Sequence, residues 1–119
     1  MDNIYQLQSF TEFKLPTTKL GGLNIPLGGG YLRIFPWLLM KQLISNFLKN
    51  NQTYFLYIHP FELSKKKAPK IDNAGFLKNS RFRYGRSNTP EKLNKLIALL
   101  KSNDYEFVTF KSLFQIANK

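Results

Sequence analysis

The feature that most constrains the fold is an uninterrupted run of β-forming residues, Thr53–Ile58, with the sequence Thr-Tyr-Phe-Leu-Tyr-Ile. Polar residues do not alternate with its apolar ones, so the run predicts a strand buried on both faces. Such strands belong to α/β sheets or to barrels that helices cover. His59 and Pro60 follow at once. A titratable residue directly after a buried parallel strand lies where α/β folds place their chemistry.

Two segments have the periodicity of amphipathic helices. The first is Pro36–Lys49, which begins with a proline suited to a first helical turn. Its polar face is only mildly basic, which favours core packing over a membrane surface. The second begins at Thr89, expected as the N-cap, and ends near Lys101–Asn103. Shorter elements are expected as strands at Phe10–Leu15 and Glu106–Phe110 and as a terminal helix at Lys111–Ala117.

Two segments are expected to be loops, and a third has a pattern that leaves two interpretations open. Glycine and proline mark Gly21–Gly30, and its run Gly28–Gly30 allows positive φ or close approach to a ligand. The run lacks the lysine of a phosphate-binding P-loop. Ser64–Lys70 is lysine-rich and typical of a solvated loop. Arg81–Arg86 alternates cations with aromatic residues, a pattern that either binds nucleic acid or sugars or anchors a loop through its aromatic rings.

Composition narrows the function classes. The 119 residues fit one domain spanning 1–119. The absence of cysteine excludes disulfide scaffolds, thiol nucleophiles and iron–sulfur sites, and one histidine excludes a His-His-Asp metal centre within the chain. The net charge of +11 suggests either an anionic partner or a lysine-rich surface that serves solubility.

No transmembrane segment is expected, because no stretch reaches about 18 uninterrupted apolar residues. The best candidate, Ile34–Leu48, is interrupted by polar residues, a lysine and a proline. The first residues show no basic segment followed by an apolar one, as a secretory signal would. The expected location is cytoplasmic, or peripheral to the inner membrane.

Imidazole is the side chain whose ordinary pKa lies near neutrality, so His59 is the strongest candidate for a general acid or base. Glu62, three residues on, is placed to orient it or to couple with its charge. A single histidine after a strand is nevertheless more often structural than catalytic. No Ser-His-Asp set is assigned, because nothing in the sequence fixes its geometry.

Several segments, taken together and in order, carry a family likeness. They are Leu15-Pro16, Gly22–Pro26, Gly28–Arg33 with Pro36, Tyr57–Glu62, Ser80–Tyr84 and the helix Leu93–Leu100. This order resembles the C-terminal part of bacterial polysaccharide deacetylases of the NodB type (carbohydrate esterase family 4). It is most similar to the subgroup associated with exopolysaccharide and exosortase gene clusters. The likeness extends from about Phe10 to Phe114.

The resemblance implies an α/β fold, the C-terminal portion of an irregular (β/α) barrel, with His59 as the acid that protonates the departing amine. Tyr57 and Ile58 would flank the acetyl pocket, and Tyr31 would shape its rim beside Gly28–Gly30. Arg33 and Arg81 would either contact the glycan or hold loops. The remaining residues placed beside the sugar are Phe61, where the family usually has tryptophan, and Glu62.

The family's divalent metal, such as zinc, is held by an Asp and a His-x-x-x-His element of an N-terminal half that this sequence lacks. The resemblance therefore predicts no cofactor in this chain, and no deacetylation without a separate half. The predicted function is the C-terminal segment of a deacetylase acting on a bacterial surface polysaccharide. The alternative is a small basic module that binds nucleic acid or an anionic glycan, with nucleic acid disfavoured as a partner. A third possibility is a relic without activity.

Overall fold

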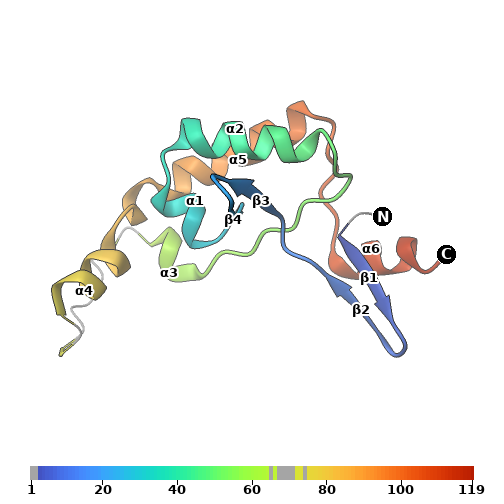
Figure 1. The fold of residues 1–119 in the computed structure, drawn as a ribbon, viewed down its shortest axis with the longest axis horizontal. Coiled ribbons are helices and arrows are strands. Elements are labelled where there is room, and N and C mark those ends of the chain that lie inside the picture. The colour runs from blue at the N-terminus through green and yellow to red at the C-terminus, as the bar shows by residue number, and fades with distance from the viewer. Residues whose placement is uncertain (1–2, 65, 67–71, 74) are drawn as a thin grey trace.

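The computed structural model describes residues 3–64, 66, 72–73 and 75–119, without the side chains of residues 81–83. Strands occupy the first quarter of the described chain and helices most of the rest (Figure 1). The strands are β1 (Ile4–Leu7), β2 (Phe10–Phe13), β3 (Thr17–Leu20) and β4 (Leu23–Pro26). The helices are α1 (Gly30–Ile34), α2 (Trp37–Leu48), α3 (Pro60–Leu63), α4 (Gly75–Arg83), a 3-10 turn at Arg86–Asn88, α5 (Thr89–Ser102) and α6 (Phe110–Ala117).

The four strands form two separate antiparallel hairpins, β1–β2 and β3–β4. The expected strand near Phe10 is present as β2. The expected loop from Gly21 instead contains the second hairpin, in which Leu20 pairs with Leu23. Gly21 and Gly22 both have positive φ, 57° and 82°, which a two-residue turn between twisted strands requires. The glycines that suggested a loop are therefore the turn of a hairpin.

The core lies between α2 and α5, which run side by side in Figure 1. Met40 and Ile44 of α2 and Leu96 of α5 are fully buried, as are Leu27 and Leu32 from the segment that precedes α2. Burying each such side chain contributes about 1.5–3 kcal/mol. The two helices predicted from apolar periodicity are confirmed, and their apolar stripes form the core.

The start of α5 differs from the prediction by one residue. Thr89 is the first helical residue, and Asn88 precedes it as the N-cap. The Thr89 hydroxyl donates to the carbonyl oxygen of Gly85 at 2.9 Å. The residue expected to cap the helix therefore ties it back to the preceding turn.

The predicted strand at 53–58 belongs to neither sheet. It runs as a long connection from α2 to α3 (Figure 1). Among the described residues, no backbone-to-backbone hydrogen bond joins residues 54–58 to another segment, and the same is true of residues 106–108. The strand predicted at Glu106–Phe110 is likewise not formed, and α6 begins at Phe110. A strand needs a hydrogen-bonded neighbour, and neither segment has one here.

The chain is extended rather than compact. Its radius of gyration is 16.3 Å, whereas about 13.5 Å is typical of a folded chain of this length. Within the described part, exposed large hydrophobic side chains outnumber the buried hydrophobic ones. None of its helices has the length and apolar character needed to cross a membrane. The described structure thus has a small core and much uncovered apolar surface.

Candidate functional site

His59 lies at the end of the extended connection and is the N-cap of α3. Its backbone is extended, with φ −79° and ψ 142°. The exposed fraction of its side chain is 60%. The imidazole of the only histidine in the sequence therefore faces solvent at the start of a short helix.

Glu62 lies directly behind this imidazole. Its Oε2 accepts the backbone N–H of His59 at 3.0 Å and lies 3.6 Å from the imidazole Nδ1. Only 4% of the Glu62 side chain is exposed. Of the two roles predicted for Glu62, orienting His59 or lying beside the sugar, its burial favours the first.

Aromatic rings flank His59 on both sides along the chain. The Tyr57 ring meets the imidazole edge-on, with centroids 5.5 Å apart, and the Phe61 ring is tilted against it at 5.8 Å. Tyr57 is 54% exposed, so its ring is open to a ligand. Since rings and imidazole are adjacent, they form one surface, which we call the histidine face: Tyr57, His59 and Phe61.

The glycine run packs against this segment. A Cβ atom on Gly28 would lie 2.7 Å from Cδ1 of Leu56, and one on Gly29 would lie 3.8 Å from the Tyr57 ring. Gly29 also has a positive φ of 56°. The glycines therefore approach residues 56 and 57 closely, rather than a ligand. This contact places the glycine run beside the histidine face.

Two arginines flank the ring of Phe61. The guanidinium carbons of Arg33 and Arg86 lie 5.9 and 5.7 Å from its centroid, within cation–π range. Arg86 also donates from Nε to the carbonyl oxygen of Phe61 at 3.0 Å. Arg33 and Arg86 are 8% and 7% exposed. Of the two roles left open for Arg33, the burial favours holding the site together.

Arg86 was not singled out by the sequence analysis. The only signal was its membership of the alternating run that ends there, in which three arginines are equivalent by pattern. Burial distinguishes Arg86. The family resemblance selected Arg81 instead, whose side chain is not among those that the structure describes.

The main chain of Arg33 is fixed from two sides. Lys92 of α5 donates from Nζ to the carbonyl oxygens of Arg33 and Phe35, both at 2.8 Å. Burial, with a smaller contribution from the charge of Lys95, lowers the pKa of Lys92. On the other side, Gly85 approaches the Arg33 carbonyl with a positive φ of 73°. Helix α5 therefore positions Arg33 under the histidine face.

The two remaining predicted site residues, Tyr31 and Ile58, differ in their exposure. Tyr31 is 40% exposed, and its ring packs edge-on against Phe35 at 5.5 Å. Ile58 is half-buried and packs against the core cluster. The core contact of Ile58 gives it a structural role, whereas exposed Tyr31 remains available at the rim.

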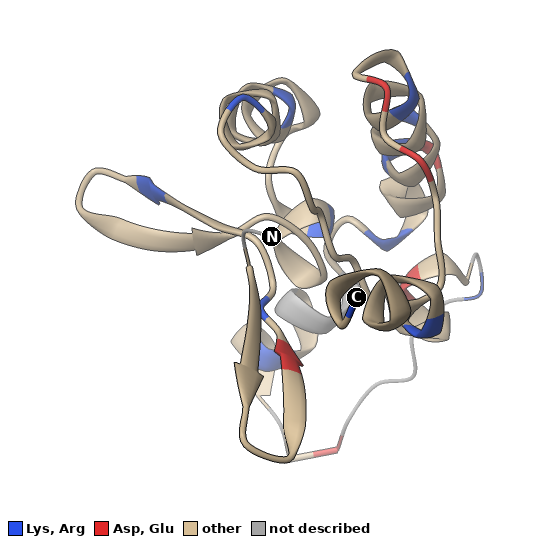
Figure 2. Ribbon diagram, turned by 90° about the vertical axis from the view of Figure 1, so that its right-hand side faces the viewer, with Lys and Arg blue, Asp and Glu red and all other residues tan. Residues whose placement is uncertain are grey.

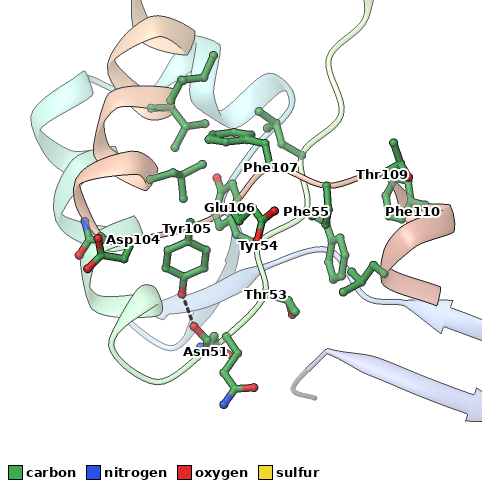
Figure 3. A pocket seen from close by; sticks show the side chains of 18 of the residues that line it. Asn51, Thr53, Tyr54, Phe55, Asp104, Tyr105, Glu106, Phe107, Thr109 and Phe110 are labelled. Carbon is green, nitrogen blue, oxygen red and sulfur yellow. Dashed lines mark hydrogen bonds between the residues drawn. The ribbon is translucent and has the colours of Figure 1, made fainter. Parts of the chain in front are cut away.

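A separate hollow, whose lining includes Leu56, lies next to the segment that carries the histidine face. Its volume is about 740 Å³, and Figure 3 shows Phe55, Phe107 and Phe110 around it. We call it the apolar groove. It lies between residues 51–56, helix α5 and residues 103–110. Its full lining is Asn51, Gln52, Thr53, Tyr54, Phe55, Leu56, Leu93, Leu96, Ile97, Leu100, Asn103, Asp104, Tyr105, Glu106, Phe107, Val108, Thr109, Phe110, Leu113 and Ile116.

Two tyrosine hydroxyls hold the ends of the groove in place. Tyr105 donates to the carbonyl oxygen of Asn51 (Figure 3), and Tyr54 donates to that of Leu27. Burial raises the pKa of both phenols, most strongly that of Tyr54. Both bonds require a protonated phenol as donor.

Three aromatic rings close the groove at its far end. Phe55 stacks on Phe110 with centroids 5.6 Å apart, and Phe13 contacts them at 5.5 and 5.2 Å. The rings come from the connection, α6 and β2, respectively. This trio ties the first hairpin to the C-terminal helix.

The basic residues do not define a second site. Figure 2 shows lysine and arginine on the hairpins and on several helices rather than on one face. The lysine-rich loop of the sequence analysis lies, apart from Ser64 and Lys66, outside the described residues. The described lysine and arginine side chains therefore form no single surface that would support the basic-module hypothesis.

The described residues contain no group of three or more His, Asp or Glu side chains placed to hold a metal ion. Around His59 the groups that could act as ligands are one imidazole and one carboxylate. The set does not fit the Asp and two His that the family resemblance implies. The chemistry available at the histidine face is proton transfer and aromatic contact.

The chain was compared with protein families, curated proteins and solved structures. Residues 3–115 match the family model described as Domain of unknown function (DUF3473). Neither the curated proteins nor the solved structures contain a match. Because the family model covers nearly the whole sequence, the chain belongs to the DUF3473 family.

Proposed function

We propose that this chain forms the histidine-bearing C-terminal part of a polysaccharide deacetylase, which removes N-acetyl groups from a bacterial surface polysaccharide together with a metal-binding half. The family is known from polysaccharide deacetylase-associated proteins, which supports this assignment. The observation that carries it is the exposed imidazole of His59 with the buried carboxylate of Glu62 behind it.

His59 acts as the general acid in this proposal. Hydrolysis of an N-acetyl group adds water to the carbonyl carbon and breaks the C–N bond. The departing nitrogen needs a proton, and the exposed imidazolium supplies it. Acetate and the free amino sugar are the products.

The aromatic rings beside His59 provide the contact with the sugar. Tyr57 and Tyr31 are exposed, and Tyr57 is adjacent to the imidazole. Aromatic rings present an apolar face with a polar edge, which suits the mixed surface of a sugar ring. Arg33 and Arg86 hold Phe61 and so keep the histidine face rigid.

The uncovered apolar surface supports the proposed second half. Residues 54–58 and 106–108 have backbone groups without backbone partners in the described chain, and the apolar groove lies between them. In a (β/α) barrel both segments would be paired strands covered by helices such as α5. A complementary half that pairs with both segments would form hydrogen bonds with these backbone groups and would bury the apolar groove.

The test is co-expression with a separately encoded N-terminal deacetylase half that carries the Asp and His-x-x-x-His elements. Acetate release from an N-acetylated chitin oligosaccharide is measured with zinc present. The pair is expected to be active and each half alone inactive. His59→Ala is expected to lower the rate of the pair about 10²–10⁴-fold, while Gln115→Ala, on the exposed face of α6, leaves it unchanged.

Two outcomes contradict the proposal. One is a pair that co-purifies with zinc bound and releases no acetate. The other is an active pair whose rate is unaffected by His59→Ala.

A further inference from the structure

We propose that the first turn of α4 binds the surface of an anionic lipid bilayer, with Phe76 and Leu77 inserted among the acyl chains and Lys78 beside the headgroups. The sequence left the location open between the cytoplasm and the periphery of a membrane, and this proposal names the residues that would make the contact. It does not depend on the proposed deacetylation, because it concerns a different surface and its test measures binding alone.

The first observation is the exposure of two neighbouring apolar side chains. Phe76 is 84% exposed, the largest fraction among the large hydrophobic side chains described, and Leu77 is 75% exposed. Single exposed apolar residues are common on protein surfaces. These two are consecutive, and they lie on a helix with almost no amphipathic pattern, so no core-facing stripe includes them. Contact with something outside the described chain would explain their exposure.

The second observation is the position of α4. It projects from the molecule at the end opposite α6 (Figure 1), along an axis 50 Å long. Among the residues that the structure describes, none from α4 belongs to the core cluster or lines the apolar groove. A partner that fills the groove would therefore contact other elements. A protruding tip with exposed apolar side chains suits insertion into a surface.

The third observation is the charge of this part of the chain. Helix α4 has the sequence Gly-Phe-Leu-Lys-Asn-Ser-Arg-Phe-Arg, with three cations and no acid. In the sequence, residues 64–83 include seven lysines and arginines and one acid, so they contribute six of the eleven net positive charges. Two apolar side chains alone bind a bilayer weakly, and stable binding needs a second signal. The attraction of basic side chains to anionic headgroups supplies it.

Charge alone would suit a nucleic acid equally well, and the cations of the described chain form no single face (Figure 2). The apolar pair both locates the site and favours lipid. Nucleic acids are bound by cations at the phosphates and by aromatic rings that stack on bases. An aliphatic side chain such as Leu77 instead gains free energy by leaving water for an apolar medium, which the acyl chains provide.

The experiment is flotation of the full chain with lipid vesicles in a density gradient. Bound chain rises with the vesicles, whereas aggregated chain does not. The vesicles are made of phosphatidylcholine alone or of an equal mixture with phosphatidylglycerol. We expect the chain to float with the mixed vesicles and to remain at the bottom with the neutral ones. Added salt should weaken the binding, because it screens the charge of the headgroups.

Variants locate the contact. Phe76→Ser/Leu77→Ser removes the apolar pair and keeps every charge. It is expected to lower the partition coefficient with mixed vesicles at least about tenfold, since the burial of two large side chains is lost. Phe76→Trp keeps a large ring and should retain binding. The matched control is Leu7→Ser/Phe10→Ser, which removes an exposed apolar pair from the β1–β2 hairpin and should leave the partition coefficient unchanged.

Four results overturn the proposal. The first is no flotation with the mixed vesicles, and the second is equal flotation with the neutral ones. The third is binding that persists unchanged in Phe76→Ser/Leu77→Ser, which would show that charge alone binds the chain. The fourth is an equal loss in both double variants, which would show that the contact is not confined to α4. None of these results bears on acetate release by the co-expressed pair, so the two proposals fail separately.

Discussion

Gly85 lies against the carbonyl oxygen of Arg33 so closely that a Cβ atom at position 85 would stand 2.4 Å from it. The same carbonyl accepts a hydrogen bond from Lys92. The residue after Gly85, Arg86, reaches over Phe61. Only glycine meets both requirements of this position, a positive φ and no side chain. The contact therefore links the start of α5 to the histidine face.

Gly85→Ala is expected to destabilise the chain by at least about 1–3 kcal/mol, because it adds strain at a positive φ to a clash with backbone. Chemical denaturation followed by circular dichroism measures the change. Gly30→Ala is the control, since a Cβ there meets nothing within 4 Å and the residue starts helix α1. Equal effects of the two variants would contradict the described contact.

Arg86 is expected to resist conservative substitution. Arg86→Ala removes a hydrogen bond from a charged, buried donor to the Phe61 carbonyl and should cost about 1.5–3 kcal/mol. Arg86→Lys keeps the charge but loses the planar guanidinium, so it should recover less than half of that loss. Denaturation midpoints test this, with Lys101→Ala on the exposed end of α5 as the control. Full recovery by lysine would show that only charge matters.

Stability is expected to fall in alkaline solution. Burial raises the pKa of Tyr54 and Tyr105, so from about pH 10 the unfolded chain loses phenolic protons that the folded chain retains. The sign is therefore a loss of stability as pH rises. Lys92, whose pKa burial lowers, acts in the opposite direction. The two tyrosines outweigh it, because the shift of Tyr54 is large.

Melting temperatures recorded from pH 7 to pH 11 check this dependence. Tyr54→Phe should flatten the alkaline slope and lower stability at neutral pH through loss of the bond to Leu27. Tyr5→Phe, at an exposed ring, should change neither. A slope that is identical in Tyr54→Phe and the unaltered chain would refute the role of Tyr54.

The aromatic trio at the end of the groove should behave as one unit. Phe13→Ala and Phe110→Ala remove rings that touch each other and share Phe55, so their effects should not add. A double-mutant cycle is expected to give a coupling of about 0.5–1.5 kcal/mol. Phe13 with Phe76, which lies on α4 at the opposite end of the molecule, is the additive control (Figure 1). Zero coupling between Phe13 and Phe110 would rule out the packed trio.

The sequence is most informative where apolar periodicity is strong. The stripes of α2 and α5 predict both helices, and those helices form the core. Helix α4 has almost no amphipathic pattern, so periodicity does not reveal it. The hairpin β3–β4 was missed because its paired glycines are equally consistent with a loop. The run 53–58 has strand propensity, but propensity alone supplies no hydrogen-bonded neighbour.

Only the local part of the candidate site can be predicted from the sequence. His59 and Glu62 are three residues apart, and an N-cap geometry brings such residues together. The burial of Arg33 and Arg86 depends on contacts between α1, α3 and the turn before α5, which are far apart in sequence. Local pattern carries no information about such contacts.

The connection that leads to His59 also determines how the isolated chain behaves in a test tube. Residues 54–58 are apolar or aromatic, uncharged and free of proline, and their main chain makes no backbone-to-backbone bond to another described segment. Segments of this kind nucleate intermolecular cross-β stacking. The chain produced alone should therefore form insoluble aggregates as its concentration rises. A partner that pairs with this segment would keep the chain in solution. The solubility of the chain during purification is therefore an assay for such a partner.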